Sequence, residues 1–110
     1  EAAALRLEAV DGAGGCEIGS LASELADVDP EARADLANSF ERWEGPIRSG
    51  LTRMQDRGDL QKDADVAALA VALLAAIQGG MLLSQVRRSA TPYRYAVAAA
   101  IEHIESFVTQ

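Results

Sequence analysis

The chain has 110 residues, and seventeen Asp and Glu against ten Lys and Arg give it a formal net charge of −7 at pH 7. This length suits one domain with a single modest core, and the acidic balance argues against nucleic-acid binding by these residues themselves. A single cysteine, Cys16, and a single histidine, His103, exclude an internal disulfide framework and the usual structural zinc sites. With no signal-peptide pattern at the start, a reducing, cytoplasmic setting is the expectation.

Glycine, proline and aspartate divide the chain into helical segments, and no stretch alternates with the period of a strand, which predicts an all-α fold. The first ten residues already have a helical pattern, so we expect further residues upstream. A short amphipathic helix is expected over residues 16–26. Asp29 and Pro30 then mark the start of a long helix, because aspartate caps free amides and proline suits the first helical position. Its apolar stripe consists of Leu36, Phe40, Trp43, Ile47, Leu51 and Met54.

The remaining boundaries follow from the same signals. Gly45 and Pro46 predict a kink in the long helix, because proline removes a backbone hydrogen bond. Gly58 predicts its end, with Leu60 folding back onto the core. Asp63 or Asp65 is expected to start a central helix that ends near Arg87 and Arg88. Thr91-Pro92 is expected to start the last helix, with Thr91 as its cap and Pro92 in the first helical position. The last helix carries a stripe of Tyr93, Val97, Ile101, Ile104 and Val108.

Residues 66–83 form the most apolar stretch of the chain, and Gln78 supplies their only polar side chain. Large residues follow one helix face, and small residues at four-residue steps follow another: Ala68, Ala72, Ala76, Gly80 and Ser84. A chain of this length can hardly cover both faces, so a second copy is expected on the small-residue side. A membrane span has a similar length, but the alanine content, Gln78 and the Gly79-Gly80 pair argue against one.

Several motifs in order along the chain resemble the C-terminal, effector-binding and dimerisation domain of TetR-type transcriptional regulators, in particular the LmrA-like subgroup. The residues that carry this resemblance are Gly15-Cys16, residues 19–25 (GSLASEL), residues 40–44 (FERWE), Gly58-Asp59-Leu60 before Asp65, and residues 73–83 (LLAAIQGGMLL). The match spans nearly all of residues 1–110. The helix-turn-helix DNA-binding domain of such regulators has no counterpart in this sequence.

The resemblance implies a bundle of about five helices in which the last two long helices, 64–88 and 92–108, pair with those of a second copy as a four-helix bundle. It also implies a homodimer that binds a small hydrophobic or aromatic effector and contacts operator DNA only through the N-terminal domain. Effector binding would then release the operator. The residues expected at the dimer interface are Ala72, Ala76, Gly79, Gly80, Val97, Ile101 and Ile104.

The candidate ligand-binding residues come from two facing stripes, one on the long kinked helix and one on the central helix. A small-molecule site needs a mostly apolar cavity with a few polar groups that orient the ligand, and Gln78 and Gln85 share one helix face. An ordinary core position is the simpler interpretation of any one candidate, whereas a cavity is the favoured interpretation of the group. The eight candidates are Phe40, Trp43, Ile47, Met54, Leu74, Gln78, Met81 and Gln85.

Other features have plainer interpretations. Each helical glycine costs about 1 kcal/mol of stability relative to alanine. The preferred reason for glycine at positions 79 and 80 is the close approach of a partner helix, and room for a ligand is the second. Cys16 is more simply a small buried hydrophobe than a redox thiol, and His103 has no catalytic partners. We therefore expect no enzyme, metal or cofactor. The alternative to an effector-binding regulator is a helical dimerisation or scaffold module without a ligand.

Overall fold

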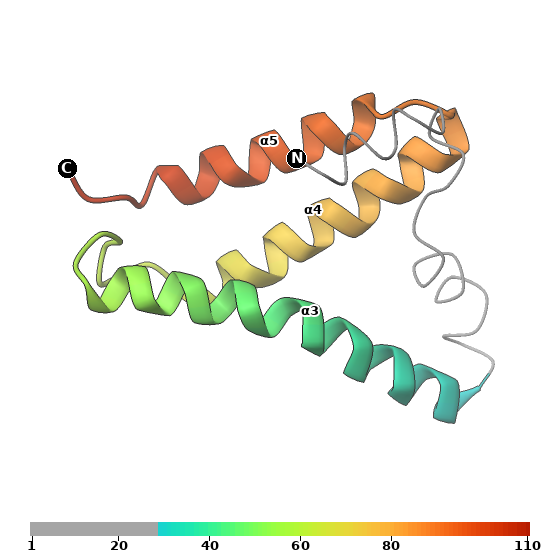
Figure 1. The fold of residues 1–110 in the computed structure, drawn as a ribbon, viewed down its shortest axis with the longest axis horizontal. Coiled ribbons are helices and arrows are strands. Elements are labelled where there is room, and N and C mark those ends of the chain that lie inside the picture. Colours follow the sequence, from blue (N-terminus) through green and yellow to red (C-terminus); the bar gives the residue numbers. More distant parts are fainter. Residues whose placement is uncertain (1–28) are drawn as a thin grey trace.

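The computed structural model of the chain describes residues 29–110. They form three helices, α3 (Pro30–Asp56), α4 (Val66–Arg87) and α5 (Thr91–Glu105), with one isolated antiparallel bridge between Leu60 and Val108. In Figure 1 α4 runs between the other two helices, and its first turns lie next to the second half of α3. The helices expected over residues 1–10 and 16–26 lie outside the described residues. The described part of the chain is thus all-helical, as predicted.

The start of α3 is fixed by the predicted cap. The Asp29 carboxylate accepts hydrogen bonds from the backbone amides of Glu31 and Ala32 at 2.9 and 3.3 Å, and Pro30 takes the first helical position. These bonds satisfy two amides that have no partner inside the helix.

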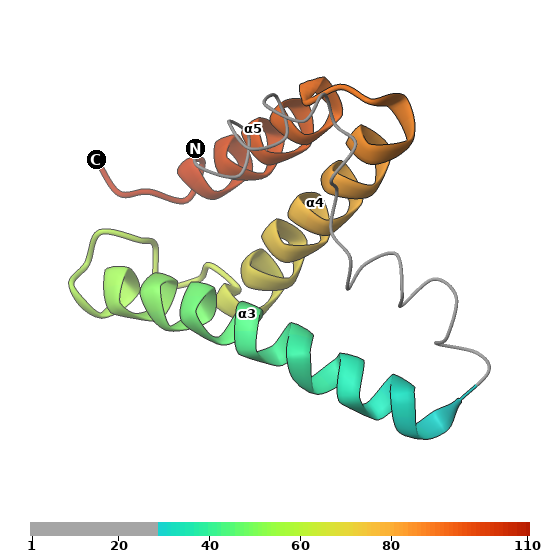
Figure 2. The same ribbon diagram turned by 45° about the vertical axis from the view of Figure 1, so that its right-hand side comes forward.

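Helix α3 continues through Pro46, and its two halves run in visibly different directions (Figures 1 and 2). The Arg48 guanidinium lies across this bend, 2.7 Å from a Glu41 oxygen and 2.5 Å from a Glu44 oxygen. Its hydrogen bond to Glu41 is the main cause that raises the pKa of Arg48 above its usual range. A charge-assisted bond network thus connects the residues on either side of the proline, where one backbone bond is missing.

The turn from α3 into α4 follows the predicted signals. Gly58 has a φ of 87°, a left-handed conformation that glycine adopts without strain, and Leu60 turns back until only 1% of it is exposed. The Gln55 amide nitrogen donates to the carbonyl oxygens of Gln61 and Ala64, both at 3.0 Å. The Asp65 carboxylate then accepts from the amide of Ala68 at 3.1 Å and caps α4.

The corner between α4 and α5 differs from the prediction. Arg88 ends α4 with a φ of 51°, but Thr91 is the first residue of α5 and does not cap it. Hydroxyl groups upstream take that role: Ser84 accepts from the amide of Tyr93 at 3.0 Å, and Ser89 accepts from the amide of Thr91 at 3.2 Å. The cap prediction at Thr91 was wrong because the buried Ser84 hydroxyl of α4 accepts from an amide in the first turn of α5.

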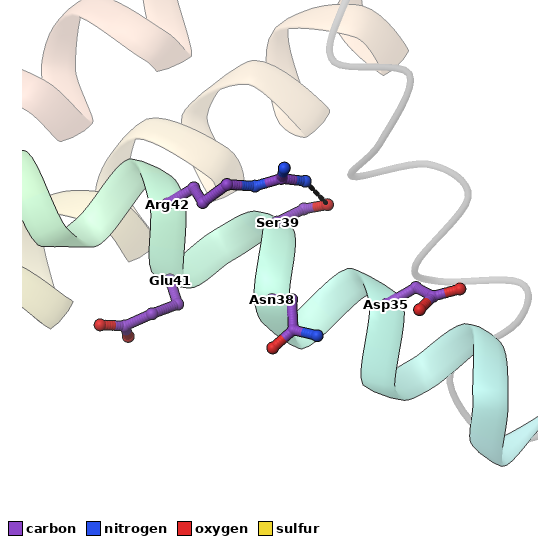
Figure 3. Close-up of a pocket in the computed structure, with 5 residues that line it drawn as sticks. All are labelled: Asp35, Asn38, Ser39, Glu41 and Arg42. Atoms are coloured by element: carbon purple, nitrogen blue, oxygen red, sulfur yellow. Dashed lines mark hydrogen bonds between the residues drawn. The ribbon is translucent and has the colours of Figure 1, made fainter.

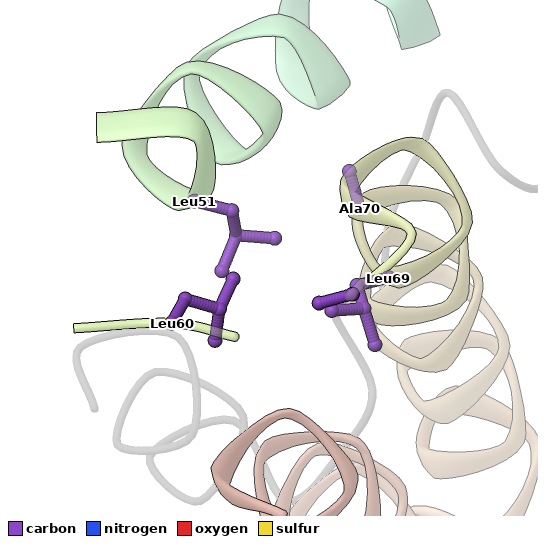
Figure 4. Close-up of a cluster of buried hydrophobic side chains, with 5 residues drawn as sticks. Leu51, Leu60, Leu69 and Ala70 are labelled. Carbon is purple, nitrogen blue, oxygen red and sulfur yellow. The ribbon is translucent and has the colours of Figure 1, made fainter. Parts of the chain in front are cut away.

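Two apolar clusters hold the helices together. The first joins α4 to α5 and contains Ala90, Tyr93 and Val97, with Ile77 and Met81 packed against them. The second joins the end of α3 to the start of α4, and Figure 4 shows Leu51 of α3 beside Leu60, with Leu69 and Ala70 of α4 facing them. Burial of these side chains is the main stabilising contribution.

The residues after α5 pair with the turn between α3 and α4. Helix α5 ends at Glu105, earlier than the predicted residue 108, and the chain continues alongside the turn. The amide of Gln61 donates to the Phe107 carbonyl at 2.9 Å, and the amide of Thr109 donates to the Asp59 carbonyl at 2.9 Å. We call residues 106–109 the C-terminal strap, because they link α5 to the end of α3.

Candidate functional site

The outward face of α4 is exposed and carries no polar side chain. Positions three and four residues apart share a face of a helix, and here they form a band along most of α4. Val71, Leu83 and Val86 are 51%, 49% and 75% exposed. We call this band the α4 outer face, and it consists of Ala68, Val71, Ala72, Ala75, Gly79, Leu82, Leu83 and Val86.

The residues predicted for a dimer interface divide into two groups. Ala72, Gly79 and Ile101 are exposed, and Ala76 is half-buried. Gly80 and Val97 are buried inside the chain, and Ile104 packs against the Leu51 cluster. A Cβ atom on Gly80 would come within 2.9 Å of the Tyr93 Cα, so the helix that approaches this glycine is α5 of the same chain. Gly80, Val97 and Ile104 therefore have little surface to offer a second copy.

The α3 residues predicted to bind a ligand also divide. Phe40 and Trp43 lie in the first half of α3, with ring centroids 5.7 Å apart in an edge-to-face arrangement, and Trp43 is 38% exposed. Ile47 and Met54 pack against the Leu51 cluster instead. Ile47 and Met54 are thus core residues, whereas the aromatic pair retains exposed surface.

On α4, Gln78 is the candidate whose side chain has an unpaired hydrogen-bond acceptor among the described residues. Its Oε1 atom is buried and has no hydrogen-bond partner among the described residues, and an orphaned buried acceptor is costly. Leu74 is buried, Met81 packs against the Tyr93 cluster, and Gln85 is half-buried. The amide oxygen of Gln78 could accept a hydrogen bond from a ligand.

The described residues do not gather the eight candidates into one place. Helices α3 and α4 pack together at the Leu51 and Leu69 end and diverge toward Pro30 and Arg87, as both views show (Figures 1 and 2). Phe40 and Trp43 lie on the diverging half of α3, and Gln78 lies beyond the middle of α4. Ile47, Met54 and Met81 pack against the two clusters, and a ligand pocket formed by the eight candidates stays a prediction.

A hollow of about 470 Å³ lies along the first half of α3, and none of the eight candidates lines it. Its lining is polar, and Figure 3 shows side chains that point in several directions, with Arg42 donating to the Ser39 hydroxyl at 3.4 Å. These residues match an ordinary solvated helix face, so no pattern in the sequence indicated a site here. The lining residues are Asp35, Asn38, Ser39, Glu41 and Arg42.

The described residues offer no group of three His, Cys, Asp or Glu side chains that could hold a metal ion. His103 is exposed and contacts Phe107 edge-to-face, with ring centroids 5.4 Å apart. Cys16 lies outside the described residues. By length and composition α4 could cross a membrane, a test that core helices of soluble proteins also pass.

Comparison with known proteins assigns the family. Residues 1–100 match the family described as tetracyclin repressor-like, C-terminal domain. The chain is also similar to the solved structure of a TetR transcriptional regulator from Chloroflexus aurantiacus J-10-fl, with a TM-score of 0.76 and 25% identity. That match covers 96% of this chain and 57% of the regulator. A search of curated proteins found no match. The chain therefore belongs to the tetracycline repressor-like C-terminal domain family of TetR-type transcriptional regulators.

Proposed function

We propose that this domain joins two copies of a transcriptional regulator through the α4 outer face and binds a small, mostly apolar effector. The observation that carries the proposal is the exposed apolar band along α4, from Val71 to Val86. A contiguous apolar surface of this kind is typical of a protein interface, because its exposure to water is unfavourable. Family membership supports the same role, since TetR regulators typically dimerise.

The intact regulator would bind operator DNA through an N-terminal helix-turn-helix domain outside these 110 residues. Effector binding in the present domain would change the spacing of two such DNA-binding domains and release the operator, as expected of a repressor. The motif at residues 73–83 favours the LmrA-like subgroup. TetR regulators are soluble cytoplasmic proteins, and the proposal places this one in the same compartment.

Dimerisation is tested by placing a charge on the α4 outer face. We expect the 110-residue chain to sediment as a dimer at micromolar concentration, and Leu83→Glu to weaken association at least tenfold, about 1.4 kcal/mol, because a carboxylate would be buried in an apolar interface. Tyr95→Glu is the matched control, because Tyr95 of α5 is 74% exposed and lies outside this face. A monomeric unmodified chain would contradict the proposal.

Effector binding is tested by thermal denaturation with a panel of hydrophobic cations, acyl compounds and aromatic molecules. A compound at one hundred times its dissociation constant stabilises the folded chain by about 2.7 kcal/mol. Trp43 is the one tryptophan of the chain, so its fluorescence reports binding near the aromatic pair of α3. Gln78→Leu should lower the affinity of compounds with a hydrogen-bond donor more than that of pure hydrocarbons.

The alternative is a dimerisation or scaffold module without a ligand. It would give the same sedimentation result, but no compound of a broad panel would raise the melting temperature or change the Trp43 fluorescence.

A further inference from the structure

The two parts of helix α3 are held in different ways. The second part is fixed to the rest of the chain, because Leu51 is buried in the cluster with Leu69 and the Gln55 amide nitrogen donates to carbonyl oxygens of the turn. The first part, residues 30–45, contributes no side chain to either apolar cluster, and none of its residues is buried. The clusters therefore do not fix the direction of residues 30–45, which we call the α3 arm.

The arm joins the fixed part at Gly45 and Pro46. Pro46 has no amide hydrogen to donate to the Arg42 carbonyl, and its ring crowds that carbonyl. The residue before a proline is disfavoured in a helix, partly because its Cβ clashes with the ring, and Gly45 has no Cβ. Packing does not require this glycine, since a Cβ on it would meet nothing within 4 Å. The helix is therefore easier to bend here than at an ordinary pair of residues.

The Arg48 side chain reaches back across this junction to two carboxylates of the arm. Its Nη1 atom lies 2.5 Å from a Glu44 oxygen and its Nη2 atom lies 2.7 Å from a Glu41 oxygen. At about 100° per residue, all three side chains lie on the face of α3 roughly opposite to Pro46. A proline ring pushes a helix open on its own side, so the helix bends toward the opposite side. The two ion pairs therefore lie on the inner side of the bend and favour the bent form.

These contacts bias the angle of the arm without locking it. The Arg48 side chain is 36% exposed, and its partners Glu44 and Glu41 are 18% and 59% exposed. Ion pairs with this much exposure are individually weak and are screened by salt, although one guanidinium shared by two carboxylates is stronger than a single pair. Weak contacts on the inner side of a bend suit a joint that has to move.

The arm carries the aromatic pair of α3. Phe40 and Trp43 lie three and six residues before Pro46, and their rings are in edge-to-face contact. Helix α4 carries Gln78, whose Oε1 atom has no hydrogen-bond partner among the described residues. Figures 1 and 2 show the arm diverging from α4 beyond the bend. The angle of the arm therefore sets the separation between the aromatic pair and Gln78.

We propose that Gly45-Pro46 is a hinge, and that Arg48 holds the α3 arm at its bent angle and so positions the aromatic pair relative to α4. Arg48 is a positioning residue, because it acts on Phe40 and Trp43 only through the direction of the arm. The use of the movement, which is to fit the arm to an effector, rests on the proposed function. The hinge itself does not depend on a ligand.

The hinge is tested by measuring the distance between spin labels on Ala34→Cys and Ala98→Cys, two exposed positions on the arm and on α5, in a Cys16→Ser chain. An excess of unlabelled Cys16→Ser chain leaves one labelled copy in each dimer. Residue 34 lies twelve residues, about 18 Å, from Pro46. A change of about 20° in the bend therefore moves its label by about 6 Å, which pulsed electron paramagnetic resonance resolves.

Arg48→Met keeps the long side chain but removes its charge, and we expect it to shift the mean distance by several ångström or to add a second population of distances. Raising NaCl from 50 to 500 mM should shift the unmodified chain in the same direction and have little further effect on Arg48→Met. Arg42→Met is the matched control, because Arg42 bonds Ser39 within the arm and its loss leaves the bend in place.

Pro46→Ala separates a hinge from a general effect of the Arg48 charge. The alanine amide restores the missing backbone bond and should straighten α3, so Arg48→Met should then change the distance little. An equal effect of Arg48→Met with and without the proline would overturn the hinge.

The hinge and the proposed effector binding fail separately, because the distance measurements use no ligand. Circular dichroism first establishes that each variant is folded. A distance that ignores both Arg48→Met and salt would overturn the hinge, whatever the compound panel shows. A panel without a binding compound would overturn effector binding and leave the distance result in place.

Discussion

Replacing Leu60 with alanine is expected to destabilise the chain by about 2–5 kcal/mol, the cost of emptying a buried leucine site. Leu60 is 1% exposed and lies where the end of α3, the start of α4 and the C-terminal strap meet. It is not in a helix, so the substitution brings no gain in helix propensity that would hide the loss. Urea unfolding followed by circular dichroism at 222 nm measures the effect as a shift of the midpoint.

Leu82→Ala is the matched control for Leu60→Ala. It removes the same atoms from a side chain that is 38% exposed. The two variants should be compared at equal protein concentration, because Leu82 lies on the α4 outer face and its loss also affects association. If Leu60→Ala costs no more than Leu82→Ala, the cluster around Leu60 does not hold the three helices together as described.

The two adjacent glycines of α4 are expected to respond to alanine with opposite signs. A Cβ on Gly80 would meet the Tyr93 backbone at 2.9 Å and the Ala96 side chain at 3.3 Å, whereas a Cβ on Gly79 would meet nothing within 4 Å. Gly79→Ala should stabilise the single chain by about 1 kcal/mol through helix propensity. Gly80→Ala should destabilise it, because α4 and α5 must move apart, and we expect the two variants to differ by about 1–3 kcal/mol.

Thermal denaturation over a range of protein concentrations measures this pair. The dilute limit reports the fold alone, and the concentration dependence reports any effect of Gly79→Ala on association. Equal stabilisation by the two alanines at the dilute limit would contradict the close contact between Gly80 and α5.

Most helix boundaries could be predicted because their causes are local. Asp29, Gly58 and Asp65 act on amides or dihedral angles within a few residues, and the structure confirms all three. The cap of α5 could not be predicted in the same way. Its buried acceptor, the Ser84 hydroxyl, belongs to the preceding helix and reaches Tyr93 only once the two helices have packed.

The candidate site was harder to predict, because an apolar stripe defines the face of a helix but not what covers it. Ile47 and Met54 share a stripe with Phe40 and Trp43. Only Ile47 and Met54 pack against the Leu51 cluster, because α4 approaches α3 in the second half of α3. For Gly80, too, the sequence pattern does not identify what covers the helix face. The sequence predicts that a helix comes close, and only the structure identifies that helix as α5 of the same chain.

The C-terminal strap has a consequence for the order of synthesis and folding. It joins Thr109 to Gly58 and Asp59, about fifty residues earlier in the chain. A ribosome makes the turn first and the strap much later, so α3 and its turn emerge before the segment that holds them. The hairpin of α4 and α5 relies on shorter-range contacts and can form earlier, because closing a longer loop has a larger entropic cost. The nascent chain therefore cannot form the bonds that tie the turn to the residues after α5 until Thr109 has left the exit tunnel, although Leu51 and Leu69 can join α3 to α4 earlier.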